Sequence, residues 1–195
     1  MSLSSLKKDN IQEYWNVITH GIGIIIALVF TAILITKTGV TDENRKVFSA
    51  LLLGLSSCLV YTTSTLYHYF WDKSYNKKLR TIDHISIYYL IAGTYTPFLW
   101  ITFDAESGTR LLWIVWSMAI LGTLFKLFFT GRFENISLAF YIIMGCVVFL
   151  ELDTLISTTP DEAFPFVVMG GVLYLVGTVF YRWKSLPYNL SLIHI

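Results

Sequence analysis

Side chains of the types that bind metals and move protons occur in three short groups of this sequence. Imidazole and carboxylate groups bind zinc, and an open zinc site activates water. Histidine and aspartate supply only two ligands here, whereas a catalytic zinc site needs about three from the protein. The groups are Glu13, Asn16 and His20 at i, i+3 and i+7, Ser64 and His68 at i and i+4, and Asp83 with His84.

The elements that must position these groups are membrane-spanning helices. The chain has 195 residues, of which 55% are hydrophobic and only 14% charged, whereas soluble domains carry about 25% charged residues. Its apolar runs each approach the roughly 20 residues that a helix needs to cross a bilayer. We therefore expect an all-α integral membrane protein with spans at about 17–36, 47–71, 82–103, 111–131, 135–152 and 163–182.

The basic residues predict the orientation of the spans and the depth of the three groups. With a cytoplasmic N-terminus, ten of the fourteen Lys and Arg residues fall in cytoplasmic segments, as the positive-inside rule requires. All three polar groups then lie at the cytoplasmic boundary. Ionisable groups inside a membrane point to a functional site, and their common depth favours one shared site.

Each group also has a structural interpretation. The Glu13 stripe could belong to a helix that lies on the membrane surface, and a single histidine near a helix end is often an interfacial residue. Asp83 could simply cap the third span, where the helix dipole favours a carboxylate. Lys126 lies about one turn from the cytoplasmic end of its span, and snorkelling of the ammonium group to the interface explains it.

Five segments around these residues resemble the haemolysin III family, the bacterial branch of the progestin and adiponectin receptor family. The resemblance covers nearly the whole chain to Asn189, which predicts one transmembrane domain over residues 1–189. The segments are EYWNVITH (Glu13–His20), STLYH (Ser64–His68), RTIDH (Arg80–His84), IAGTYTPF (Ile91–Phe98) and WKSLPY (Trp183–Tyr188).

The resemblance implies a seven-helix bundle with a cytoplasmic N-terminus, of which six helices are present here. It also implies a zinc ion near the cytoplasmic face, held by His68 and by two histidines of the seventh helix. Asp83 would reach the zinc through a water molecule, with Ser64 nearby, and Glu13, Asn16 and His20 in support.

The end of the chain departs from the family pattern. Histidines are expected at positions 190 and 194, but the sequence reads LSLIHI, with Leu190 in place of the first and His194 in place of the second. This hexapeptide matches the translation of a common sequencing-adapter end. We therefore expect residues 190–195 to be a non-native tail, His194 to be in register by chance, and the zinc site to be incomplete.

Three functions fit these observations. The resemblance implies a zinc-dependent hydrolase of lipid amides or esters, with Asp83 as proton acceptor and Ser64 stabilising the oxyanion, in membrane-lipid homeostasis. A pore-forming cytolysin and a receptor-like protein without catalysis are the alternatives. The formal net charge of +1 excludes a nucleic-acid partner. Membrane lipids are the expected partners, and the bacterial inner membrane is the expected location.

Overall fold

The computed structural model describes residues 3–38 and 44–182, and these residues form helices joined by short turns, without a strand among them. Long apolar runs form helices because a helix satisfies its own backbone hydrogen bonds. The elements are α1 (Leu3–Thr38), α2 (Asn44–Tyr69), α3 (Asn76–Thr102), α4 (Ala105–Phe129), α5 (Glu134–Cys146), the short 3₁₀ helix η1 (Val147–Glu151), α6 (Leu152–Thr158) and α7 (Phe164–Arg182).

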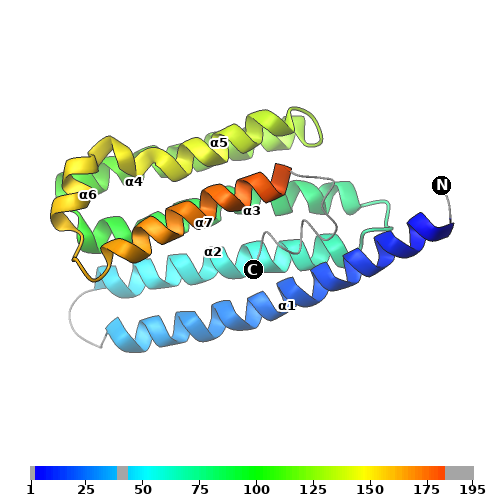
Figure 1. Ribbon diagram of the computed structural model, residues 1–195, viewed down its shortest axis with the longest axis horizontal. Helices are drawn as coiled ribbons and strands as arrows, with labels where there is room; N and C mark the ends of the chain where they lie inside the picture. Colours follow the sequence, from blue (N-terminus) through cyan, green and yellow to red (C-terminus); the bar gives the residue numbers. More distant parts are fainter. Residues whose placement is uncertain (1–2, 39–43, 183–195) are drawn as a thin grey trace.

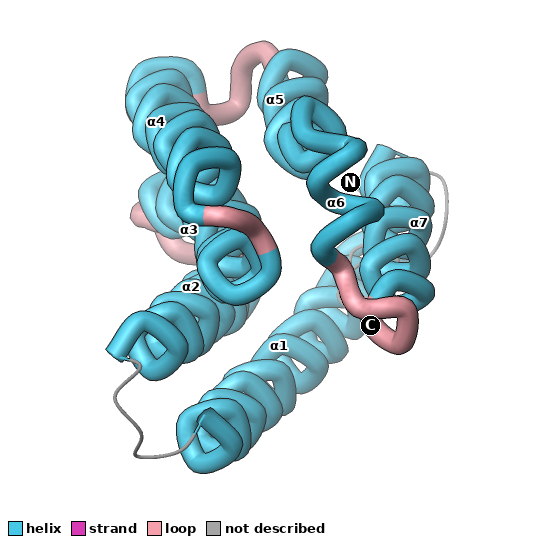
Figure 2. Tube along the Cα trace, turned by 90° about the vertical axis from the view of Figure 1, so that its left-hand side faces the viewer, coloured by secondary structure: helices cyan, strands magenta, loops and turns pink. Residues whose placement is uncertain are grey.

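The helices run side by side along the long axis of the molecule (Figure 1). Consecutive helices pack as neighbours from α1 to α4, α5 packs on α3 and α4, and α7 packs on α5. Figure 2, which views the bundle nearly end-on, shows α3 between α2 and α4. The buried apolar core accordingly lies mainly on α3, α4 and the α5–α6 segment, and includes Tyr88, Leu99, Leu111, Val115 and Met144.

Apolar side chains also cover the outside of the bundle, as lipid contact requires. Among the residues that the structure describes, four segments are long and apolar enough to cross a membrane: Ile11–Lys37, Asn44–Tyr69, Ala105–Phe129 and Glu134–Thr158. The helix α3 is less apolar because it contains several Tyr and Thr residues, which suits a helix packed among three others. The predicted class, an all-α integral membrane protein, is confirmed.

The helices α1 and α3 begin well before the spans that they contain. The helix α1 is continuous from Leu3, so Glu13 and Asn16 lie on the same helix as the first span. The helix α3 begins at Asn76, so Asp83 lies about two turns inside it and cannot be its N-cap. The surface-helix interpretation of the Glu13 stripe and the capping interpretation of Asp83 are therefore both wrong.

The fifth predicted span is one apolar segment that changes helix type at its middle. The 3₁₀ helix η1 separates α5 from α6, which leaves backbone groups without their α-helical partners. The Tyr95 hydroxyl of α3 donates to the carbonyl oxygen of Gly145 at 2.8 Å and accepts from the amide of Val148 at 3.2 Å. A side chain of the neighbouring helix thus completes the backbone hydrogen bonding at this break.

A carboxylate caps α4 where the chain turns back from α3. The Asp104 side chain accepts hydrogen bonds from the amides of Glu106 and Ser107 at 3.0 and 2.9 Å. These donors, together with the helix dipole, stabilise the ionised carboxylate. The backbone hydrogen bond from Ser107 lowers the pKa of Asp104 below its ordinary value of 3.8.

The helices α1 and α2 approach closely because glycine lacks a side chain. A Cβ atom at Gly54 would lie 2.2 Å from the Thr31 hydroxyl oxygen, and one at Gly23 would lie 2.5 Å from the Tyr61 ring. Neither position can carry a larger residue without moving the two helices apart. This contact is what holds α1 in place, because α1 packs mainly on α2.

Candidate functional site

The contact between His68 and Glu13 brings together α2 and α1. The Glu13 Oε2 atom lies 2.6 Å from His68 Nδ1, and the two side chains are 25% and 4% exposed. A carboxylate can only accept, so Nδ1 carries the proton of this hydrogen bond. The Asn16 amide lies 3.3 Å from the same Nδ1 atom. The imidazole of His68 is therefore held in one orientation between α1 and α2.

Asp83 approaches the same imidazole from α3. Its carboxylate lies beside the Ser64 hydroxyl, within reach of a hydrogen bond, and close enough to His68 for electrostatic interaction. Ser64 and His68 are both buried on one face of α2. The structure thus brings Ser64, His68 and Asp83 together, and the end of the bundle that holds these residues is called the site end below.

His20 lies one to two turns deeper along α1 than Glu13. It is fully buried, and its ring centroid lies 5.3 Å from that of His68. All of the polar residues that the sequence groups at the first three spans therefore gather between α1, α2 and α3, except His84. The structure gives the positions of these side chains, and their chemical roles stay predictions.

His84 points to a second polar cluster, on the side of α3 that faces α4 and α5. Its Nδ1 atom lies 3.1 Å from the ammonium nitrogen of Lys126, which in turn lies 2.8 Å from Glu134 Oε2. Lys126 is 0% exposed, so the snorkelling interpretation is wrong. In the sequence, this cluster is marked only by one lysine within an apolar run.

The described residues do not complete a metal site. Within residues 3–38 and 44–182, no group of three or more His, Cys, Asp and Glu side chains is placed to hold a metal ion. His68 Nε2 and the Asp83 carboxylate are two donors, fewer than a catalytic zinc needs from the protein. The predicted ligand His194, Leu190 and the predicted tail lie outside the described residues.

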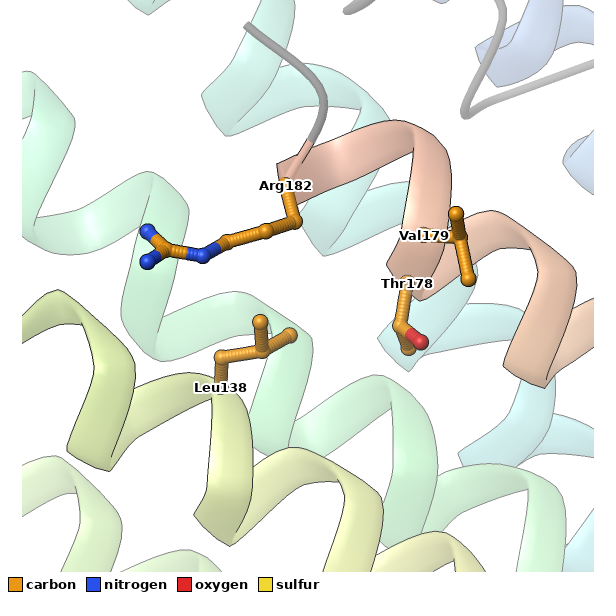
Figure 3. A pocket seen from close by; sticks show the side chains of 4 residues that line it. All are labelled: Leu138, Thr178, Val179 and Arg182. Carbon is orange, nitrogen blue, oxygen red and sulfur yellow. The ribbon is translucent and has the colours of Figure 1, made fainter.

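A pocket between α5 and α7 lies apart from these residues. It has a volume of about 450 Å³ and is lined by Leu138, Thr178, Val179 and Arg182. Figure 3 shows the Arg182 side chain extending across its mouth towards Leu138. None of the predicted site residues lines this pocket.

Comparison with known proteins shows the family. Residues 8–191 match the family model described as Haemolysin-III related. The chain belongs to the haemolysin-III related family. The predicted family is therefore confirmed, and the segments that carried the resemblance lie within the matched range.

Individual relatives share most of the length of this haemolysin-III related chain. Hemolysin-3 of Bacillus cereus is 39% identical over 184 residues, which are 94% of this chain and 84% of the relative. The Hemolysin-3 homolog of Bacillus subtilis (strain 168) is 40% identical over 183 residues, which are 94% and 86% of the two chains. The human Monocyte to macrophage differentiation factor is 26% identical over 189 residues, covering 92% and 76%. No solved structure matches.

Proposed function

We propose that this protein acts in membrane-lipid homeostasis by hydrolysing a lipid ester or amide at the cytoplasmic face of a bacterial inner membrane. The observation that carries the proposal is the 2.6 Å contact between Glu13 and His68 Nδ1, next to Asp83 and Ser64. A buried imidazole held by a carboxylate, beside a second carboxylate, is a set of groups that can move protons. The basic residues of the site end support its cytoplasmic orientation.

The reaction follows from the roles that these side chains can take. Water adds to the carbonyl carbon of the lipid, and Asp83 accepts the proton that the water releases. The bond from the carbonyl carbon to the leaving oxygen or nitrogen breaks as this proton passes to the leaving atom. Ser64, which lies beside Asp83, can donate a hydrogen bond to the oxyanion that forms.

We also propose zinc as the cofactor, with His68 as the ligand on α2. The hydrogen bond from Nδ1 to Glu13 supports this role, since a carboxylate at one ring nitrogen is the usual partner of a histidine that binds a metal through the other. Zinc held at His68 would polarise the lipid carbonyl and lower the pKa of the attacking water. Metal analysis of the purified protein tests the cofactor, with His68→Ala expected to lose bound zinc.

The hydrolytic proposal is tested on purified protein in vesicles of a bacterial phospholipid and, separately, of an N-acyl lipid. Mass spectrometry would follow fatty-acid release from each. We expect Asp83→Asn to lower the rate by about 100-fold or more, the usual contribution of a general base. Asp72→Asn is the matched control, because Asp72 is an exposed carboxylate at the same end. Absence of fatty-acid release from every lipid, or full activity in Asp83→Asn, would contradict the proposal.

A pore-forming function is the second candidate, because two relatives carry the name Hemolysin-3. A pore needs polar side chains through the full thickness of the membrane. The polar contacts of the described site residues gather at one end of the bundle instead, which supports hydrolysis over pore formation. Rapid dye leakage from vesicles that contain the protein would favour the pore.

A further inference from the structure

The cluster of His84, Lys126 and Glu134 joins the site ends of three helices. Lys126 of α4 is completely buried and lies 2.8 Å from Glu134 Oε2 of α5 and 3.1 Å from His84 Nδ1 of α3. An ammonium group has only donors, so Lys126 donates to the lone pair of His84 Nδ1. A buried ammonium persists in a membrane protein when such partners surround it.

Further hydrogen bonds fix the partners of Lys126 in turn. Glu134 accepts from Arg80 of α3 at 3.3 Å through its other carboxylate oxygen, which also accepts from the Gly131 amide at 3.2 Å. The Tyr141 hydroxyl of α5 donates to the carbonyl oxygen of His84 at 2.8 Å. The first turns of α3 are therefore attached to α4 and α5 through both backbone and side-chain groups.

Asp83 and His84 are consecutive residues, and they belong to two different polar clusters. Consecutive side chains on an α-helix project about 100° apart. Asp83 lies against Ser64 of α2, while His84 meets Lys126 on the other side of α3. Only one rotation of α3 about its axis satisfies both contacts, so a group that holds His84 also sets the direction of Asp83.

We propose that Lys126 and Glu134 are positioning residues: through His84 they set the rotation of α3 and hold the Asp83 carboxylate against Ser64 and His68. The value of this arrangement for hydrolysis rests on the proposed function, but the geometric claim can be tested without any activity. Neither residue touches the reacting groups, and their effect on the site passes through the helix that carries Asp83.

Disulfide trapping in membranes measures this geometry directly. In a background with Cys58→Ala and Cys146→Ala, Ser64→Cys and Asp83→Cys form one reporter pair. Gly23→Cys and Tyr61→Cys form a second pair between α1 and α2, where a Cβ atom at Gly23 would lie 2.9 Å from the Tyr61 Cγ atom and loss of the ring makes room for it. Oxidation with copper phenanthroline gives the cross-linking rate of each pair. A disulfide closes only when its Cβ atoms come within about 4.5 Å.

We expect Lys126→Met and Glu134→Gln to slow the 64–83 cross-link by about tenfold, because closure depends steeply on Cβ separation. The 23–61 cross-link does not involve α3 and should keep its rate. Lys73→Met is the matched control, since Lys73 is an exposed lysine of the same end, and it should change neither rate.

Two results would overturn the proposal. Unchanged 64–83 cross-linking in both variants would mean that Lys126 and Glu134 do not position Asp83. Equal slowing of both pairs would mean that they support the fold as a whole and not the rotation of α3. Because the readout is a cross-link, a failure of the hydrolytic proposal would leave this result unaffected, and a failure here would leave the hydrolytic proposal open to its own test.

Discussion

The orientation of the His68 imidazole on α2 is set by Glu13, which lies on α1. A carboxylate at Nδ1 selects the tautomer and raises the basicity of the imidazole, and its removal from metal-binding histidines costs about 10–100-fold in affinity or activity. We therefore expect Glu13→Gln to lower both zinc content and fatty-acid release by about 10–100-fold. Glu106→Gln, at an exposed position on α4, is the control. Wild-type values in Glu13→Gln would show that the contact has no functional role.

Because Lys126 is buried and Glu134 is partly exposed, we expect the two substitutions Glu134→Gln and Lys126→Met to lower the free energy of unfolding by different amounts. Glu134→Gln leaves a completely buried ammonium without its carboxylate, and should lower the free energy of unfolding in detergent by about 3–5 kcal/mol. Lys126→Met should cost less, because the Glu134 side chain is 26% exposed and keeps its contact with Arg80. Thermal unfolding of the two variants in the same detergent measures the difference. A larger loss in Lys126→Met would contradict this account of the pair.

At the residue scale, sequence patterns predicted the depth of the polar side chains in the membrane better than the helix that each side chain faces. The spacing of Ser64 and His68 places both on one face of α2, and this holds in the structure. The partner of Lys126 could not be predicted, because His84 lies 42 residues away in the sequence and spacing carries no information on contacts between helices. Consecutive residues on a helix do not share a face, so the sequence predicts that His84 points away from the site that contains Asp83, and its contact with Lys126 confirms this.

The helix α4 depends on its cap for a pH-dependent part of its stability. The folded pKa of Asp104 lies below its ordinary value, so its stabilising contribution is fully present above about pH 4 and is lost as the pH falls through the lowered pKa. We expect Asp104→Ala to lower the melting temperature at pH 7 by a few degrees. The difference from wild type should shrink towards zero in more acidic solution. A difference that is constant from pH 7 to pH 2 would contradict the role of the ionised cap.

The break between α5 and α6 depends on one hydroxyl group of α3. Tyr95→Phe leaves the Gly145 carbonyl and the Val148 amide without their shared partner, and unsatisfied buried groups cost about 1–3 kcal/mol. We expect that loss in the free energy of unfolding in detergent. Tyr89→Phe, a change of the same size on α3, is the control. If both variants unfold alike, the hydroxyl of Tyr95 does not stabilise the break.

At the element scale, the apolar runs predicted the existence of the helices but not their ends. The basic segment before Asp83 was expected to be a loop, yet Asn76–Ile82 is already helical. Hydropathy reports where a helix enters the bilayer, and a helix can continue beyond that point into water. The 3₁₀ turn at Val147–Glu151 was also missed, because its support comes from Tyr95 on another helix.

The bundle as a whole predicts which loops face the cytoplasm. Ser74, in the turn between α2 and α3, is exposed at the site end, and Glu106 is exposed at the opposite end. In a protein whose native cysteines are replaced, Ser74→Cys should react with an impermeant maleimide only in inverted vesicles. Glu106→Cys should react in intact cells from which the outer barrier has been removed. The reverse pattern would place the N-terminus and the site end outside.

The glycine contact between α1 and α2 links the middle of the membrane to the site end. Gly54 and His68 are fourteen residues apart on α2, or about 21 Å along the helix axis. A methyl group at position 54 would clash with the Thr31 hydroxyl. The clash would push apart the two helices, which pack against each other along their length. The separation of α1 and α2 would then move the carboxylate of Glu13 away from the imidazole of His68, although neither residue is changed. The smallest side chain in the sequence thus sets a distance of 2.6 Å at the far end of the helix pair.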